Sequence, residues 1–273
     1  MIQYPDLNPN AITLGSFSIK WYGVCYLIAF SLCYWQAIIK KPSNWSREQV
    51  VDLLFYLSMG VIFGGRLGYI LFYCPIDIID NPLTLLQFWL PGRSFHGGLL
   101  GVLIAIIFYA KKNHYSFLEI TDFIAPIAPI GIACGRIGNF INGELWGRVT
   151  DVSWGMVFAH VDQLPRHPSQ IYEFLLEGVM LFLILNIDNW RSYSNRFYKN
   201  KSALFLIFYA LFRIFVENYR EPDFDQGFIV NMTMGQILSI PMLIAGFGLL
   251  LGSVKKQHVL LNERLSERSE FSE

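Results

Sequence analysis

One run of aromatic and charged residues, FYALFRIFVENYRE, concentrates side chains that can do chemistry. Intervals of four, four and three residues place its polar members on one helical face: Tyr209, Arg213, Glu217 and Arg220. Two arginines against one carboxylate leave an excess positive charge, and the planar arginine fork suits phosphate. The spacing predicts an anion site. The alternative is an Arg213–Glu217–Arg220 ladder that satisfies itself and fixes the helix end.

A second polar run, GRIGNFINGELWGR, follows the end of an apolar stretch at residues 135–148. Its candidate ligand-binding residues are Arg136, Asn139, Asn142, Glu144 and Gly147. Glycines in this run allow sharp backbone turns and the close approach of a ligand. The alternative is a glycine-rich turn with an arginine that snorkels towards the interface.

Three further polar residues, Tyr22, Arg66 and His96, lie within or at the edge of apolar stretches. An ionisable group inside a membrane span is costly and is therefore a candidate for function. The imidazole of His96 suits proton transfer near neutral pH, although it can equally be a structural group. Tyr22 can belong to the aromatic belt at the interface. Glu173 and Glu177 lie one helical turn apart and can counter the buried arginines.

The elements that must position these residues are apolar. Hydrophobic residues make up 53% of the 273 residues and charged residues 15%, against about 25% charge in a typical soluble domain. A membrane-spanning helix needs roughly 20 mostly apolar residues. Seven stretches approach that length: 15–39, 50–73, 95–110, 117–138 (broken by Pro126 and Pro129), 168–187, 203–219 and 233–252. We predict an all-α integral membrane protein, a bundle of about seven transmembrane helices.

The distribution of lysine and arginine predicts the orientation of this bundle. Thirteen of these residues follow the first, third, fifth and seventh stretches, and four lie in the opposite loops. This places the N-terminus outside and the C-terminus in the cytoplasm. We expect residues 1–273 to form a single polytopic membrane domain. Its outer loops are 74–94, 139–167 and 220–232, and its charged cytoplasmic tail is 253–273.

Together the polar residues predict a site on one side of the membrane. They come from five stretches and gather towards the outer ends, where an anionic phospholipid headgroup would lie. No chain of ionisable residues crosses from face to face, as a proton-relay transporter would show. The formal net charge of zero argues against a nucleic-acid partner. The four scattered cysteines predict neither a disulfide framework nor a metal site.

The sequence resembles the prolipoprotein diacylglyceryl transferase family over nearly its whole length. The resemblance rests on KWYGVCYLIAF, GGRLGYILFY, SFHGGLLG, GRIGNFINGELWGR, RHPSQIYE and FRIFVENYREPD, which occur in the family's order. It implies a bacterial inner-membrane enzyme of lipoprotein biosynthesis. Such an enzyme moves the sn-1,2-diacylglyceryl group of phosphatidylglycerol to the lipobox cysteine of preprolipoproteins. The products are a thioether and glycerol-1-phosphate, and neither a metal nor an organic cofactor is needed.

The resemblance also implies roles for the candidate residues. Arg136 and Arg213 are expected to be essential, binding the phosphate and stabilising the departing oxygen. His96 is the leading base for the substrate thiol, with Tyr22 and Tyr209 as rivals. The remaining residues are expected to bind substrate or to orient the arginines: Arg66, Asn139, Asn142, Glu144, Gly147, Glu217 and Arg220.

Two other functions are compatible with intramembrane arginines. A transporter or flippase of an anionic lipid or solute would be open to both sides and would often carry an internal repeat. A lipid-binding scaffold would use the arginines only as clamps. Formation of a thioether-linked lipid on a lipobox peptide separates the enzyme from both.

Overall fold

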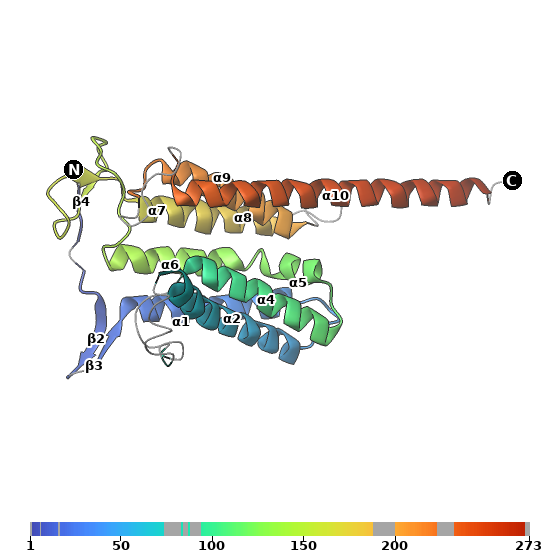
Figure 1. The fold of residues 1–273 in the computed structure, drawn as a ribbon, viewed down its shortest axis with the longest axis horizontal. Helices are drawn as coiled ribbons and strands as arrows, with labels where there is room; N and C mark the ends of the chain where they lie inside the picture. The colour runs from blue at the N-terminus through green and yellow to red at the C-terminus, as the bar shows by residue number, and fades with distance from the viewer. Residues whose placement is uncertain are drawn as a thin grey trace. The chain divides into compact units, whose positions relative to one another are not determined.

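The computed structural model describes residues 2–5, 7–15, 17–73, 83, 87, 94–187, 200–222 and 232–270. The chain divides into two compact units, Met1–Cys33 with Ala125–Glu273, and Tyr34–Ile124. Both units are mainly helical (Figure 1). Helix α1 (Trp21–Lys40) supplies residues to each of them.

The unit of residues 34–124 is built on two helices that touch at their backbones. Along α2 (Arg47–Tyr73), a glycine recurs every fourth residue, and α4 (Phe95–Asn113) carries a matching pair. A Cβ atom on Gly64 would overlap the carbonyl oxygen of Gly97, and one on Gly101 would overlap that of Gly60. Small residues at this spacing let membrane helices approach closely. The glycines therefore serve the packing of α2 against α4.

Aromatic packing closes the other end of this unit. Trp45 is almost fully buried, with its ring centroid 4.7 Å from that of Tyr115 and 4.9 Å from that of Phe123 in α5 (Phe117–Ile124). The hydroxyl of Tyr109 donates a hydrogen bond of 2.7 Å to the carbonyl of Gln49. These contacts join the start of α2 to the end of α4 and to α5.

The first predicted membrane stretch, 15–39, starts too early. Residues 10–20 form an antiparallel hairpin of β2 (Asn10–Leu14) and β3 (Phe17–Lys20), and the helix begins at Trp21. Gly15 has a φ of +59° in the turn, which glycine adopts without steric cost. Ile12 and Ile19 face each other across the ladder, so apolar strand residues extend the hydropathy signal ahead of the helix.

A second small sheet joins distant parts of the unit that holds both chain ends. Strand β1 (Ile2–Gln3) pairs in parallel with β4 (Met156–Val157), which pairs antiparallel with β5 (Pro165–Arg166). The ring of Tyr4 stacks on Phe158, and its hydroxyl donates to the carbonyls of Phe140 and Ile141. The N-terminal segment thus holds the end of helix α6 (Ala128–Ile141).

The rest of this unit consists of helices. Residues 169–186 are helical throughout, but α7 (Ser169–Glu173) and α8 (Leu181–Asn186) flank a π-helix, η2 (Phe174–Met180). Helices α9 (Lys201–Glu217) and α10 (Met234–Glu270) pack side by side (Figure 1). Because α10 runs on to Glu270, the predicted tail 253–273 continues a helix over most of its length.

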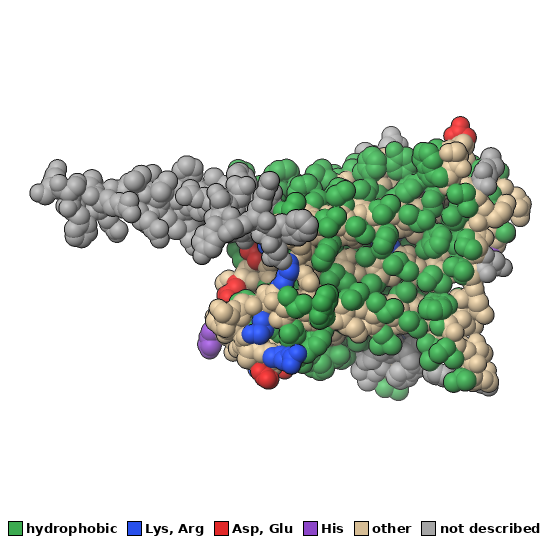
Figure 2. All heavy atoms as spheres, turned by 180° about the vertical axis from the view of Figure 1, so that it is seen from behind, with side chains coloured by type: hydrophobic (Ala, Val, Ile, Leu, Met, Phe, Trp, Pro, Cys, Tyr) green, Lys and Arg blue, Asp and Glu red, His purple; other side chains and the backbone are tan. Residues whose placement is uncertain are grey.

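Among the residues that the structure describes, four segments are long and apolar enough to cross a membrane: Trp21–Lys40, Arg47–Leu71, Ser169–Asn186 and Met234–Gly252. A fifth results if α5 and α6 form one span broken near Pro126, where the proline pair predicted an interruption. Hydrophobic side chains cover much of the face in Figure 2, and Leu27 and Leu251 are each 68% exposed. Each of the seven predicted stretches contains a helix. The count of seven spans stays a prediction, because α4 and α9 are not among these candidates.

Candidate active site

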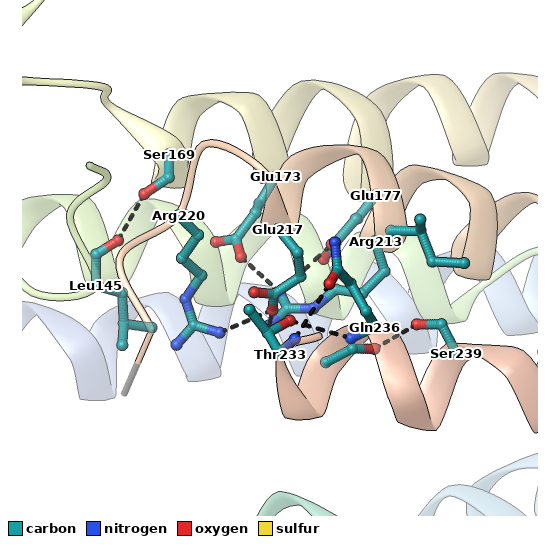
Figure 3. Close-up of polar contacts among 12 residues, drawn as sticks. Leu145, Ser169, Glu173, Glu177, Arg213, Glu217, Arg220, Thr233, Gln236 and Ser239 are labelled. Carbon is teal, nitrogen blue, oxygen red and sulfur yellow. Dashed lines mark hydrogen bonds and ion pairs between the residues drawn. The ribbon is translucent and has the colours of Figure 1, made fainter. Parts of the chain in front are cut away.

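Three arginines and three glutamates form one ion-paired cluster in the unit that holds both chain ends. Arg136 comes from α6, Glu173 and Glu177 from α7 and η2, and Arg213 and Glu217 from α9. Arg220 follows the end of α9 and contacts Glu217 at 3.3 Å. Figure 3 shows the side chains of Glu173, Glu177, Glu217 and Arg213 converging, with Arg220 beside them.

Arg136 and Arg213 share the same two carboxylates. The Nε of Arg136 lies 3.3 Å from Glu173 Oε2, and its Nη2 lies 3.3 Å from Glu177 Oε2. The Nη1 of Arg213 lies 2.6 Å from Glu173 Oε1 and 3.5 Å from Glu177 Oε1. Its Nη2 pairs with Glu217 at 2.5 Å. Each of the first two glutamates therefore bridges both arginines.

The prediction of an excess positive charge at this site is wrong for the described residues. Glu173 and Glu177 are fully buried and balance charge that the α9 sequence alone leaves uncompensated. The Arg213–Glu217–Arg220 ladder, the simpler alternative, is present as part of the larger cluster. Buried charges are strongly destabilising unless they are paired, so the three acidic residues allow three arginines to lie in an apolar bundle.

Two features of the backbone bring the cluster together, and the sequence reasoning found neither. The π-helix, with its i→i+5 hydrogen bonds, carries Glu177 and is a form often seen at functional sites. Gly235 in the first turn of α10 is the second: a Cβ there would overlap the Glu217 carboxylate and lie 3.1 Å from Arg213 Nε. Thr233 and Gln236 exchange two hydrogen bonds that fix the start of α10 beside it (Figure 3).

The segment after α6 folds back on a single carboxylate. Glu144 Oε1 accepts hydrogen bonds from Asn139 Nδ2 at 2.8 Å and from Asn142 Nδ2 at 3.4 Å. Gln170 Nε2 donates to the Glu144 carbonyl at 2.7 Å, and the Ser169 hydroxyl donates to the Leu145 carbonyl at 2.8 Å (Figure 3). The three predicted polar residues are thus brought together, with support from α7 that the sequence reasoning missed.

Gly147 is fixed by its neighbours. Its amide donates to the His167 carbonyl at 2.8 Å, and a Cβ on it would lie 2.5 Å from the carbonyl oxygens of both His167 and Tyr219. The next residue, Arg148, donates to the carbonyls of Arg220 and Glu217. This crossing ties the loop after α6 to the end of α9, where the arginine cluster lies.

Two ion pairs of Arg166 anchor a later part of the same loop. Arg166 Nη2 lies 2.6 Å from Asp162 Oδ2, and its Nη1 lies 3.2 Å from Glu221 Oε2. The hydrogen bond from Arg166 lowers the pKa of Asp162 from its usual value. Burial lowers the pKa of the neighbouring His167, which favours its neutral form.

The remaining predicted residues have their own packing contacts, and one of them has an undescribed side chain. The Tyr22 ring packs against Gly138 of α6, and its hydroxyl is 3.2 Å from that of Tyr26. The ring of Tyr209 stacks on Phe205 in α9. Tyr209 also interacts electrostatically with the cluster residues Arg136, Arg213, Glu173 and Glu177, so it borders the cluster. Arg66 is buried in the unit of residues 34–124, with its guanidinium 6.0 Å from the Tyr69 ring centroid. His96 belongs to helix α4, but its side chain is outside the described part of the structure.

The apolar helices and the buried charge cluster place the chain in the class of helical membrane proteins with a buried polar site between apolar helices. The profile of the prolipoprotein diacylglyceryl transferase family matches residues 9–252. This protein belongs to that family.

Bacterial relatives carry the same description. The phosphatidylglycerol–prolipoprotein diacylglyceryl transferase of Legionella pneumophila (strain Philadelphia 1) is 51% identical over 256 residues, covering 91% of this chain and 98% of the relative. The Coxiella burnetii protein (strain RSA 331) of that name is 49% identical, covering 90% and 95%. That of Pseudoalteromonas atlantica is 48% identical, covering 93% and 91%.

Proposed function

We propose that this enzyme transfers the sn-1,2-diacylglyceryl group of phosphatidylglycerol to the lipobox cysteine thiol of preprolipoproteins. A carbon–sulfur thioether bond forms, the bond from the glyceryl carbon to the phosphate oxygen breaks, and glycerol-1-phosphate leaves. The observation that carries this proposal is the 51% identity to a transferase of that name over nearly the whole of both chains. The comparisons give no support to the alternative of a transporter or flippase.

The proposed setting is the bacterial inner membrane, with seven spans in a single polytopic domain. The helix within each predicted stretch supports the span count, and the lysine and arginine distribution supports an outside N-terminus and a cytoplasmic C-terminus. In this orientation the Arg136–Arg213 cluster lies towards the outer face, where secreted preprolipoproteins and phosphatidylglycerol are accessible. Other membrane lipids surround the apolar surface.

Arg136 and Arg213 are proposed to bind the phosphodiester and to stabilise charge on the departing oxygen. Their side chains are 17% and 12% exposed, whereas Glu173 and Glu177 are fully covered. The accessible part of the shared cluster therefore belongs to the arginines. A guanidinium has five N–H donors in a fixed plane, and the closest glutamate contacts of Arg136 use only its Nε and Nη2 groups.

The other candidate residues are proposed to support binding and proton transfer. Asn139, Asn142 and Glu144 form a hydrogen-bonded group that can orient the headgroup hydroxyls. Gly147 and Arg220 hold the loop against the end of α9, where Glu217 pairs with Arg213.

His96 remains the proposed base for the thiol, and Tyr22 and Tyr209 are the alternatives. Arg66 is proposed as a substrate-binding residue. Replacement of His96 by asparagine would refute the first assignment if turnover and its pH dependence stayed unchanged.

The decisive assay uses purified protein, phosphatidylglycerol vesicles and a peptide with a lipobox cysteine. We expect a thioether-lipidated peptide by mass spectrometry and equimolar glycerol-1-phosphate. A peptide with serine in place of the cysteine should give neither product. Phosphatidylglycerol consumption without peptide lipidation, or the absence of any product from active-site-intact protein, would contradict the proposal.

Arg136→Lys provides a matched test of the arginine role, because lysine keeps the charge but loses the planar fork. We expect at least a hundredfold loss of kcat/KM for phosphatidylglycerol, since one oxyanion-stabilising donor contributes about 10²–10³ in rate. Lys111→Arg, on an exposed helix end, serves as the control. Normal lipid transfer by Arg136→Lys would remove Arg136 from the essential residues.

A further inference from the structure

Glu173, Glu177, Arg136 and Arg213 form a closed ring of alternating charge. Each carboxylate directs one oxygen to one arginine and the other oxygen to the second arginine, at 2.6 to 3.5 Å. One oxygen of each carboxylate is hydrogen-bonded: Glu173 Oε1 accepts from Arg213 Nη1, and Glu177 Oε2 accepts from Arg136 Nη2. The other oxygen, Glu173 Oε2 or Glu177 Oε1, lies in ion-pair contact with the second arginine but has no hydrogen-bond partner among the described residues. The carboxylates therefore set the separation of the two guanidinium groups. A glutamate that merely neutralised one arginine would need only one of these contacts.

Burial divides the ring into a covered part and an accessible part. The two glutamate side chains have no exposed surface, while both arginines retain some. The exposed surface of the ring therefore belongs to the arginine side chains and not to the carboxylates. This arrangement is suited to presenting cations at fixed positions rather than to storing an ion pair.

Close packing between the parent helices restrains the ring further. Gly178 follows Glu177 directly in the π-helix, and a Cβ on Gly178 would lie 2.8 Å from the Ala133 Cβ in α6. Arg136 follows Ala133 by three residues in the same helix. The π-helix and α6 are therefore in backbone contact next to the ring, which leaves the glutamates little freedom to move relative to Arg136.

We propose that Glu173 and Glu177 are positioning residues for the transfer reaction, acting through the two arginines that they bridge. This inference rests on the proposed function. The two glutamates do not touch the substrate. They hold Arg136 and Arg213 at the spacing that the phosphate of the leaving glycerol-1-phosphate requires when the carbon–oxygen bond breaks. We expect their loss to lower kcat, because a displacement of about 1 Å at a reacting centre can reduce the rate about 10²-fold.

The test compares glutamine and aspartate variants at both positions with wild type in the vesicle assay. Glutamine retains the size of glutamate but presents an N–H donor to an arginine N–H group, so the bridge opens on one side. For Glu173→Gln we expect kcat to fall at least tenfold, with KM for phosphatidylglycerol changing less than threefold. Glu177→Gln, whose contacts are longer, should show a smaller fall of the same kind.

Aspartate variants keep the test informative if a glutamine variant fails to fold. Glu173→Asp retains the charge and shortens the side chain by one methylene, so it should fold and still lose turnover through misplaced arginines. Glu119→Gln, on the exposed side of α5, is the matched control and should retain wild-type kcat and KM. Melting temperatures measured for every variant separate loss of folding from loss of turnover.

Two results would overturn the inference. One is wild-type kcat in folded Glu173→Asp and Glu177→Asp; the other is a loss confined to KM, which would make the glutamates binding residues. Failure of the wild-type protein to lipidate the peptide would instead refute the proposed function, so the two failures are distinguishable.

Discussion

Replacement of Gly147 by alanine is expected to loosen the crossing between the loop after α6 and the end of α9. The added Cβ would lie 2.5 Å from two backbone carbonyl oxygens and 2.7 Å from the His167 Cβ. None of these atoms belongs to the end of a flexible side chain, so the backbone segments must separate. Separation weakens two hydrogen bonds, from the Gly147 amide to His167 and from the Arg148 amide to Tyr219.

The expected magnitude follows from these two effects. Overpacking of a tight site costs about 1–3 kcal/mol, and each backbone hydrogen bond contributes about 1 kcal/mol. A total of about 3–5 kcal/mol corresponds to a fall of roughly 5–9 °C in apparent melting temperature for 273 residues, because the entropy of unfolding is about 2.1 cal/mol/K per residue. Activity should fall as well, because Arg148 would no longer hold the carbonyls of Glu217 and Arg220 at the end of α9.

The assay is thermal unfolding in detergent, followed by lipid transfer at a temperature where every variant is folded. Gly131→Ala is the control, because a Cβ there meets nothing within 4 Å and alanine favours a helix. It should melt at or slightly above the wild-type temperature. A Gly147→Ala protein that melts within 2 °C of wild type and transfers lipid normally would refute the steric explanation.

Two further predictions concern packing and pH. Gly64→Leu should force α2 and α4 apart and lower the melting temperature by at least as much as Gly147→Ala. Gly98→Ala is the control and should not lower it, because the added Cβ would lie 3.7 Å from the nearest atom, the Val61 carbonyl oxygen. Equal melting temperatures for the two variants would show that the glycines are not needed for close approach. The Asp162 carboxyl has a folded-state pKa below its ordinary value near 3.9. The pairing of Asp162 with Arg166 therefore stabilises the 156–166 loop at pH values above about 3.9. This stabilisation is lost as the pH falls through the lowered pKa. The protection of amides in this loop, taken as the exchange rate relative to that of an unstructured peptide at the same pH, should therefore fall below about pH 4 in wild type. Asp162→Asn should show this lower protection already at about pH 7. Identical protection profiles for the two proteins would contradict this account.

The sequence predicts the helices well and their first boundary poorly. Long apolar runs coincide with helices because few other structures satisfy the backbone in a membrane. The start of α1 was misplaced because Phe17 and Ile19, which lie in the second strand of the hairpin, extend the apolar signal ahead of the helix. Hydropathy averaged over a window cannot separate alternating strand residues from the helix that follows.

The members of the candidate site were predicted, and so was a role for Glu173 and Glu177 in countering the buried arginines. The sequence did not predict which glutamate oxygen contacts which arginine. Spacing along α9 finds Arg213, Glu217 and Arg220, because these residues share one helix. The bridging by Glu173 and Glu177 depends on contacts between helices and on a π-helix, for which the local sequence shows no signal that we could use. Gly235 was missed for the same reason, since its role is visible only when α10 is placed against α9.

The parallel pairing of β1 with β4 has a consequence for the time course of synthesis. Residues 2 and 3 can form their ladder only after residues 156 and 157 have been made. At about 5–20 residues per second, translation of the intervening chain takes roughly 8–30 s. During that interval, residues 2 and 3 lack their partner strand. The Tyr4 hydroxyl cannot yet donate to the carbonyls of Phe140 and Ile141, because those residues are not yet made. The loop that carries Glu144 is therefore completed late, and its folding depends on keeping the start of the chain available until then.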